Sequence, residues 1–250
     1  MGRCKNREIH TVVDMEAEDP RFIAVKLLRV LRKHYTYREL EEYFNIPAPS
    51  IWKYITGKVL PTPEKAREIL DTIVAKKMVS QLIKRLIKTV DGGIIDLSDI
   101  IYDVGILKLI GLEAYYYFAE QKPSIIVSIE VDGIPVALSV AEYFNAKIVI
   151  VKKRPEASLR EYIEYSFISR DLPVITKLYA PREPFTRRDR VLIVDDLLRT
   201  GRTCRALIEM VKNTPSKPIG VFSILAVGNG WVPVLEETGL KVHIVYWYKQ

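Results

Sequence analysis

The segment VLIVDDLLRTGRT, residues 191–203, constrains the fold of this chain more than any other. Four apolar residues lead directly into Asp195 and Asp196, and a Thr-Gly-Arg-Thr turn follows. An apolar run of this kind is typical of a strand buried on both faces of a parallel sheet, and ligands bind at the carboxyl ends of such strands. Two carboxylates cannot both be buried there without partners. We therefore expect the acidic pair to face a polyol, a metal ion or another cation.

The turn after the acidic pair has the composition of a phosphate site. Thr200, Gly201, Arg202 and Thr203 offer backbone N–H groups, two hydroxyl groups and a guanidinium group at the start of an expected helix. A polyol site beside a phosphate site predicts a binding site for a ribose 5-phosphate.

Residues 191–203 resemble the phosphoribosyl diphosphate (PRPP) binding motif of the type I phosphoribosyltransferases. The resemblance implies that Asp195 and Asp196 hold the ribose 2′ and 3′ hydroxyl groups, and that Arg199 to Thr203 wrap the 5′-phosphate. It also implies Mg²⁺ bound with PRPP, which the two aspartates would contact through the ligand. The alternative is a buried strand that ends in two solvated aspartates. The order of strand, acidic pair and small-residue turn favours the PRPP site.

A second segment, SIIVSIEVDGIPVA, combines a buried strand over Ser124–Ile129 with a turn and a helix from about Pro135. It resembles the pyrophosphate loop of the same family, in which successive backbone N–H groups face the leaving group. The expected loop residues are Ile129, Glu130, Val131, Asp132 and Gly133.

The pyrophosphate loop departs from the family pattern at Asp132, where many relatives carry Arg, Lys or a small residue. A carboxylate a few ångströms from a phosphate costs on the order of 1–4 kcal/mol unless Mg²⁺ intervenes. Ligand binding is therefore expected more firmly than catalysis, and no residue stands out as a general acid or as a selector of one base.

Three further segments are candidate parts of the same site. Strand Lys147–Val151 ends in Lys152, Lys153 and Arg154, which suit a polyphosphate, although such a charge run is also typical of a solvated face. The stretch 161–168 is interpreted as a mobile flap. Trp231 follows a Gly-Asn-Gly turn, and it is expected either to stack on a base or to cover the surface.

Composition indicates a cytoplasmic protein. The 250 residues are 48% hydrophobic, enough for one large domain or two moderate ones, and no run of about 18 apolar residues predicts a membrane span. Met1–Asn6 carries no signal for secretion or myristoylation. Cys4 and Cys204 are too few for a disulfide framework, and no Cys/His cluster suggests zinc.

The net charge of +7 is confined to the first part of the chain. Residues 1–90 hold 18 Lys and Arg against 11 Asp and Glu, whereas residues 91–250 hold 20 of each kind. A basic segment joined to a neutral one suggests a nucleic-acid partner for the basic segment.

The basic segment has helix signals in the order of a helix-turn-helix. Asp19 and Pro20 begin one helix, Thr36 caps a second with Glu39 in a capping box, and a third runs over about Pro49–Thr56. The stretch YRELEEYFNIPAPSIWKYITGKVLP resembles the helix-turn-helix of archaeal and bacterial transcription regulators. A last helix of this kind enters the major groove of DNA.

On this interpretation the third helix exposes Ser50, Lys53 and Tyr54 to DNA, while Ile51 and Ile55 pack inward. The flanking residues with expected phosphate contacts are Arg38 and Lys58. Trp52 is either a core residue or a groove contact. The alternative for the whole segment is a small helical bundle that binds protein or only decorates an enzyme.

A single helix over residues 63–88 is expected between the two lobes, because the segment has no internal Gly or Pro. The predicted limits are a helix-turn-helix domain over 1–61, a connecting helix and linker over 62–93, and a ligand-binding domain over 94–250.

The alternation of strands and helices in residues 94–250 predicts a mostly parallel α/β sheet with flanking helices, which matches the type I phosphoribosyltransferase fold. The remaining strands are expected at 191–194, 220–227 and 242–247, with helices near 108–120, 135–144, 204–212 and 232–238.

Two functions of different classes follow. The first is a DNA-binding regulator, resembling the purine-repressor type and archaeal regulators with an orotate-phosphoribosyltransferase-like domain, that senses PRPP or a nucleotide. The second is a working purine or pyrimidine phosphoribosyltransferase. A homodimer is expected, because helix-turn-helix proteins read paired half-sites. The sequence does not reveal the effector, the operator or the direction of the response.

Overall fold

The structure is a computed structural model that describes residues 19–90, 94–155, 161–168 and 175–249. The chain divides into two compact units, Met1–Met78 and Val79–Gln250, and each is described by itself. Within the described residues, no helix has the length and apolar character to cross a bilayer.

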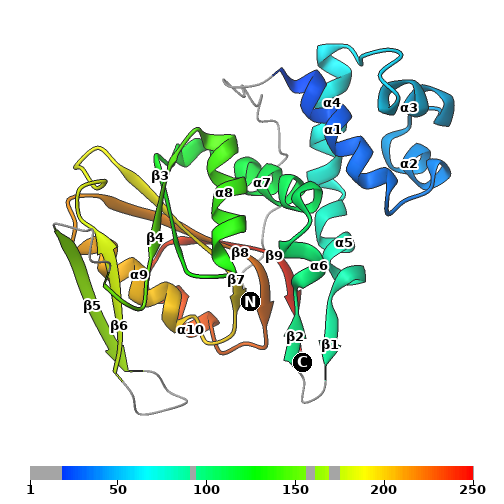
Figure 1. Cartoon of the computed structure of the whole chain (residues 1–250). Helices are drawn as coiled ribbons and strands as arrows, with labels where there is room; N and C mark the ends of the chain where they lie inside the picture. The colour runs from blue at the N-terminus through cyan, green and yellow to red at the C-terminus, as the bar shows by residue number, and fades with distance from the viewer. Residues whose placement is uncertain (1–18, 91–93, 156–160, 169–174, 250) are drawn as a thin grey trace. The chain divides into compact units, whose positions relative to one another are not determined.

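The first unit is helical (Figure 1). Its helices are α1 (Pro20–Arg32), α2 (Tyr37–Phe44), α3 (Ala48–Ile55) and α4 (Pro63–Ala75). Both predicted N-caps are confirmed: the Asp19 carboxylate accepts the Arg21 N–H at 2.9 Å, and Thr36 and Glu39 form a reciprocal capping box. Side chains from all four helices form the core, among them Leu27, Leu28, Leu31, Leu40, Ile51, Ile69 and Ile73.

The turn between α2 and α3 is fixed by two residues. Asn45 adopts the left-handed conformation, with φ of 52°, and ends α2. Pro47 offers no side-chain cap to α3, but Glu41 of α2 supplies one, since its Oε2 accepts the Ala48 N–H at 3.2 Å. The cap therefore comes from the preceding helix and helps to hold α2 and α3 together.

The predicted continuous helix over 63–88 is wrong. Helix α4 ends at Ala75, Lys77 is left-handed with φ of 53°, and α5 (Met78–Leu86) begins a new segment, followed by strand β1 (Lys88–Val90). The buried residues of α4 face α1, and Met78 is buried directly after the break. Tertiary packing thus outweighs the good helix propensity of Lys76 and Lys77, the two residues at the break.

Helix α4 packs on α1 in the first unit, although the predicted domain limits assigned it to a connecting segment. Those limits stay predictions.

The second unit is built on a five-stranded parallel sheet in the order β4-β3-β7-β8-β9. Its strands are β3 (Ile125–Ile129), β4 (Lys147–Val151), β7 (Arg190–Leu198), β8 (Lys217–Val227) and β9 (Lys241–Tyr248). All five predicted strands are confirmed, β4 with the expected limits. Strand β7 lies at the centre, which explains its uninterrupted apolar run.

Helices cover both faces of this sheet, α7 and α8 on one and α9 and α10 on the other (Figure 1). Their limits are α7 (Val104–Phe118), α8 (Gly133–Phe144), α9 (Arg202–Lys212) and α10 (Val232–Glu236), and the 3-10 turn η2 (Ala119–Gln121) follows α7. The predicted parallel α/β sheet with flanking helices is therefore confirmed.

Several elements of the second unit were not predicted, and β1 is one of them. Strand β2 (Ile94–Asp96) pairs with β1, and α6 (Ser98–Ile101) follows it. Strand β5 (Tyr162–Ile168) pairs antiparallel with β6 (Ile175–Pro181). The segment interpreted as a flap thus forms a strand over residues 162–168, and residues 156–160 and 169–174 lie outside the described part of the chain.

Candidate functional site

The candidate site gathers at the carboxyl ends of β3 and β7, which are hydrogen-bonded neighbours in the sheet. Asp195 and Asp196 occupy the end of β7, and the loop from Glu130 leaves the end of β3 to start α8. The structure thus brings the predicted acidic pair and the predicted pyrophosphate loop to the same edge of the sheet.

The two aspartates have different surroundings. Asp195 is 6% exposed, and its Oδ1 accepts the backbone N–H of Asp196 at 3.1 Å. The Cys204 thiol, fully buried on α9, lies 3.5 Å from Asp195 Oδ2 and donates to it. Burial, and then the neighbouring Asp196 charge, raises the pKa of Asp195 well above its usual range. Burial also raises the pKa of the Cys204 thiol, so this cysteine is a protonated core residue.

Asp196 faces a cavity of about 180 Å³. Burial raises the pKa of the Asp196 carboxyl, and the charge of Asp132 raises it further. The other lining residues are Ile95, Asp96, Leu97, Ser98, Ile101, Tyr102, Asp132 and Leu197. The cavity therefore combines apolar walls with hydroxyl groups and hydrogen-bond acceptors, which suits a polar heterocycle or sugar. Sequence reasoning missed the segment 95–102.

The loop expected to bind pyrophosphate is anchored at both ends. The Glu130 carboxylate accepts the backbone N–H of Lys153 at 2.8 Å, which ties the end of β3 to the end of β4, and the Glu130–Val131 peptide bond is cis. At Gly133, an added Cβ would lie 2.2 Å from the buried Ser128 hydroxyl. Only glycine therefore allows α8 to begin so close to β3.

Asp132 is the exposed acidic residue of this loop. The Tyr102 hydroxyl lies 3.5 Å from its Oδ1, at the limit of a hydrogen bond. One oxygen of the other acidic residue, Glu130, accepts the Lys153 backbone N–H, whereas Asp132 is exposed.

The predicted phosphate turn packs against the turn that holds Trp231. Gly201 has φ of 69°, and an added Cβ would lie 3.2 Å from the Trp231 backbone. Arg199 and Thr200 are exposed, while Arg202 and Thr203 are half-buried. Within the described residues, neither guanidinium group has a hydrogen-bond or ion-pair partner. In the part of the chain that the structure describes, no side chain caps α9, so its first N–H groups are free to meet an anion.

Trp231 is 8% exposed and packs in the core. Its ring centroid lies 5.0 Å from that of Trp247, and both indole N–H groups donate to the Gly228 carbonyl, at 3.2 and 2.8 Å. These contacts support a packing role, and stacking of Trp231 on a base stays a prediction.

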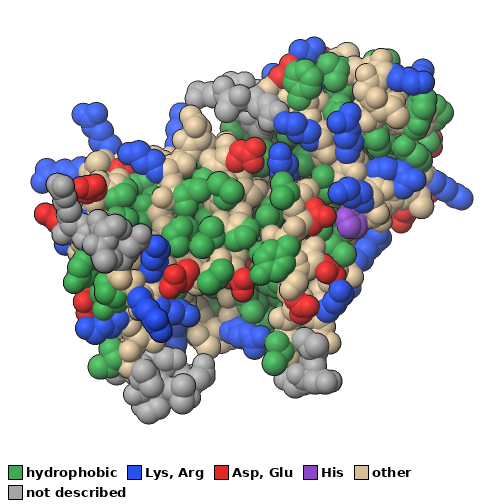
Figure 2. All heavy atoms as spheres, in the orientation of Figure 1, with side chains coloured by type: hydrophobic (Ala, Val, Ile, Leu, Met, Phe, Trp, Pro, Cys, Tyr) green, Lys and Arg blue, Asp and Glu red, His purple; other side chains and the backbone are tan. Residues whose placement is uncertain are grey.

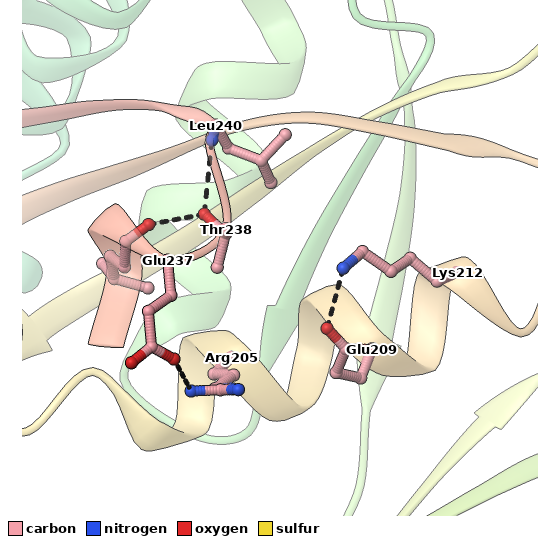
Figure 3. Close-up of polar contacts among 7 residues, drawn as sticks. Arg205, Glu209, Lys212, Glu237, Thr238 and Leu240 are labelled. Carbon is pink, nitrogen blue, oxygen red and sulfur yellow. Dashed lines mark hydrogen bonds and ion pairs between the residues drawn. The ribbon is translucent and has the colours of Figure 1, made fainter. Parts of the chain in front are cut away.

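Figure 3 shows polar contacts of α9 and of the segment after α10. Arg205 of α9 contacts Glu237 at 2.6 Å, just after α10, and Glu209 contacts Lys212 within α9 at 2.8 Å. The Thr238 hydroxyl donates to the Leu235 carbonyl and accepts the Leu240 N–H at 3.3 Å. The Arg205–Glu237 pair therefore links α9 to the segment after α10, whereas the other contacts are local.

The three basic residues after β4, Lys152, Lys153 and Arg154, differ in their surroundings. The backbone of Lys152 pairs with Tyr179 of β6 at 2.9 and 2.8 Å, whereas Lys153 and Arg154 are exposed. A polyphosphate role for the three residues stays a prediction.

No group of three His, Cys, Asp or Glu side chains suited to a metal ion occurs among the described residues. Asp196 and Asp132 nevertheless both line the cavity. Mg²⁺ is commonly held by one or two carboxylates together with the phosphates of its substrate. The residues present therefore fit a Mg²⁺ ion that arrives with a polyphosphate, with Asp196 and Asp132 as the oxygen donors.

The candidate DNA contacts lie in the first unit, where Lys and Arg side chains crowd the face shown in Figure 2. Lys53 and Lys58 are exposed, and Ser50 and Tyr54 are half-buried. Arg38 is exposed and forms a 3.4 Å pair with Glu42, of the kind that contributes little to stability. Their roles in DNA binding stay predictions.

Residues 99–242 match the family model described as "Phosphoribosyl transferase domain". The "Probable purine biosynthesis transcriptional regulator PurR" of Streptococcus pneumoniae is 30% identical over 151 residues, which is 59% of this chain and 55% of the regulator. The "Purine biosynthesis transcriptional repressor PurR" of Bacillus subtilis is 25% identical over 52% of this chain and 46% of the repressor. The chain thus spans about half the length of these regulators.

Enzymes are similar too. The "Xanthine phosphoribosyltransferase" of Clostridium novyi is 30% identical over 56% of this chain and 75% of the enzyme. Among solved structures, adenine phosphoribosyltransferase from Rhodothermus marinus superposes with a TM-score of 0.59 at 21% identity, over 68% of this chain and 98% of the enzyme. The last likeness shows the fold alone.

We expect Asp195→Asn to raise the free energy of unfolding at neutral pH by about 1–3 kcal/mol, since it removes a poorly paired buried charge. The folded-state pKa of Asp195 is raised, so the folded protein holds this proton more tightly than the unfolded chain. The gain should therefore shrink as the pH falls through the folded-state pKa to about 4, near the ordinary aspartate pKa. Urea unfolding measures both, and equal gains at the two pH values would contradict the account.

We expect Gly201→Ala to weaken binding of Mg²⁺-PRPP about tenfold, because the added methyl group crowds the Trp231 backbone and displaces the phosphate turn. Gly239→Ala is the matched control: its φ of 65° gives a similar backbone penalty, but nothing lies within 4 Å of the added Cβ. Titration calorimetry compares the two variants. Equal losses of affinity would show that crowding at Trp231 is irrelevant.

Proposed function

The chain belongs to the phosphoribosyl transferase domain family, and we propose that it is a DNA-binding transcription regulator that senses PRPP or a nucleotide through this domain. The observation that carries the proposal is the acidic character of the cavity at the end of β7. Asp132 and Asp196 line it together, and the charge of Asp132 raises the pKa of Asp196. A loop that presents a carboxylate to a pyrophosphate group is better suited to holding a ligand with Mg²⁺ than to stabilising the negative charge that develops on a leaving group.

The first unit supports the regulatory half of the proposal. It has a capped α2, a left-handed turn at Asn45 and a third helix that bears exposed lysines. The similarity to regulators of purine biosynthesis points the same way. In this proposal the regulator acts as a cytoplasmic homodimer that reads paired half-sites.

Ligand binding would use the groups that the site provides. Asp196 would accept hydrogen bonds from the ribose hydroxyl groups, and Asp195 would hold the end of β7 in place while contributing a second acceptor. The free N–H groups of α9, with Arg199 and Arg202, would hold the 5′-phosphate. When bound, Mg²⁺ would neutralise charge between the pyrophosphate and the carboxylates. To change DNA occupancy, the ligand must bind one conformation of the regulator better than the other.

The second candidate function is a working phosphoribosyltransferase, favoured by the 30% identity to a xanthine phosphoribosyltransferase. In that reaction a base nitrogen would form a bond to C1′ of PRPP as the bond to pyrophosphate breaks, with the backbone loops stabilising the departing charge. The two functions use the same site and differ in whether PRPP is consumed.

The test is incubation of the full chain with Mg²⁺, PRPP and a panel of purine and pyrimidine bases, with nucleotide and pyrophosphate measured together. We expect PRPP to remain intact and to bind, and Asp196→Asn to weaken that binding about tenfold or more, because hydrogen bonds to a charged group are lost. Glu209→Gln, on the solvent side of α9, neutralises a carboxylate outside the site and is the matched control. Turnover abolished by Asp196→Asn would overturn the regulator proposal in favour of an enzyme.

A further inference from the structure

The segment that forms α3 and the turn after it contains no acidic residue. Residues 47–62, which span α3 and the turn after it, contain no Asp or Glu, but they contain Lys53 and Lys58. Arg29 of α1 joins them, since its Nε donates to the Ile55 carbonyl at 2.7 Å at the end of α3. Glu41 of α2 lies at the other end of the helix, where it accepts the Ala48 N–H. The C-terminal end of α3 and the turn after it are therefore complementary to a polyanion.

The largest exposed side chain of α3 is Trp52, which is 40% exposed, whereas its neighbour Ile51 is fully buried. Ser50 and Tyr54, which were expected to be the outward residues with Lys53, are half-buried. The exposed side chains of α3 therefore include the indole ring of Trp52 and the lysine Lys53.

The turn after α3 holds this indole ring in place. Gly57, with φ of 74°, lets the chain reverse so that the Lys58 N–H donates to the Lys53 carbonyl at 3.0 Å. The reversal brings Lys58 Nζ to 4.3 Å from the centre of the Trp52 ring. A cation at this distance is attracted to the ring and restricts its motion, which lowers the entropy cost of a contact made by the ring.

An immobilised apolar ring among cations fits one feature of DNA well. The major groove presents apolar surface at the C5-methyl group of thymine, next to phosphates that attract lysines. We propose that Trp52 is a specificity-determining residue that recognises a thymine methyl group in the major groove, with Lys58 holding the ring and Lys53 beside it. The proposal rests on the DNA-binding function proposed above and adds the base that is read.

The experiment begins with a duplex selected by the full-length wild-type protein from a pool of random sequence. Each thymine of that duplex is then replaced singly by uracil, which differs only by the missing methyl group. We expect replacement at one position in each half-site to weaken binding about fourfold, the effect of one buried methyl group. The other replacements should leave affinity unchanged.

Variants assign the effect to the indole. Trp52→Ala should bind the thymine duplex and the uracil duplex with equal affinity at the sensitive position, because the contact has been removed. Arg38→Met, the comparison variant, removes an expected phosphate contact outside the turn that holds the ring. It should weaken binding to both duplexes equally and reduce the salt dependence. Circular dichroism confirms that each variant is folded.

Four results would overturn the proposal, and they are distinguishable. If no thymine is sensitive to replacement, or if Trp52→Ala still distinguishes thymine from uracil, the indole does not read the methyl group. Affinity for DNA that Trp52→Ala leaves unchanged would show that the ring does not contact DNA. Failure to select any duplex would refute the DNA-binding function itself.

Discussion

The candidate site depends on the burial of one carboxyl group, that of Asp195, at the end of the central strand. Strand β7 lies between β3 and β8, so its end is enclosed by neighbours. The Asp195 carboxyl group is held there by one backbone N–H and by the Cys204 thiol. Such partners compensate only part of the cost of removing a charge from water. Burial of this carboxyl group at the end of β7 therefore lowers the free energy of unfolding. Such a loss is typical of residues retained for function rather than for packing.

The groups around Asp195 are arranged by close packing rather than by ion pairs. Gly133 allows α8 to approach β3, and Gly201 allows the phosphate turn to approach Trp231. Three carboxylates line the cavity, and that of Asp96 accepts hydrogen bonds from Ser98. In the proposed regulator, Asp196 and Asp132 are the carboxylates that would meet the ligand. The basic helical unit, by contrast, carries its distinctive groups on the surface, around Trp52 and Lys53.

Strong local signals made much of this structure predictable. Continuous apolar runs identified the five parallel strands, and the caps at Asp19 and Thr36 located two helices. The break at Lys77 was missed because it has no Gly or Pro, although the apolar stripe is interrupted there. Strand β5 was missed despite its alternation, with Ile163 buried between exposed residues. Its stability comes from β6, a long-range pairing that a local pattern cannot show. The cavity wall over 95–102 was missed for the same reason, since no local pattern links it to Asp196.

The central claim is that PRPP or a nucleotide alters DNA binding through the phosphoribosyl transferase domain. The most direct measurement is the affinity of the full chain for a selected duplex, with and without saturating Mg²⁺-PRPP, in the wild type and in Asp196→Asn. The account predicts a change of at least about fivefold in the wild type, a typical coupling between two sites. It also predicts that Asp196→Asn keeps the ligand-free affinity for DNA but loses the response. Equal DNA affinities with and without bound PRPP and nucleotides would contradict the claim.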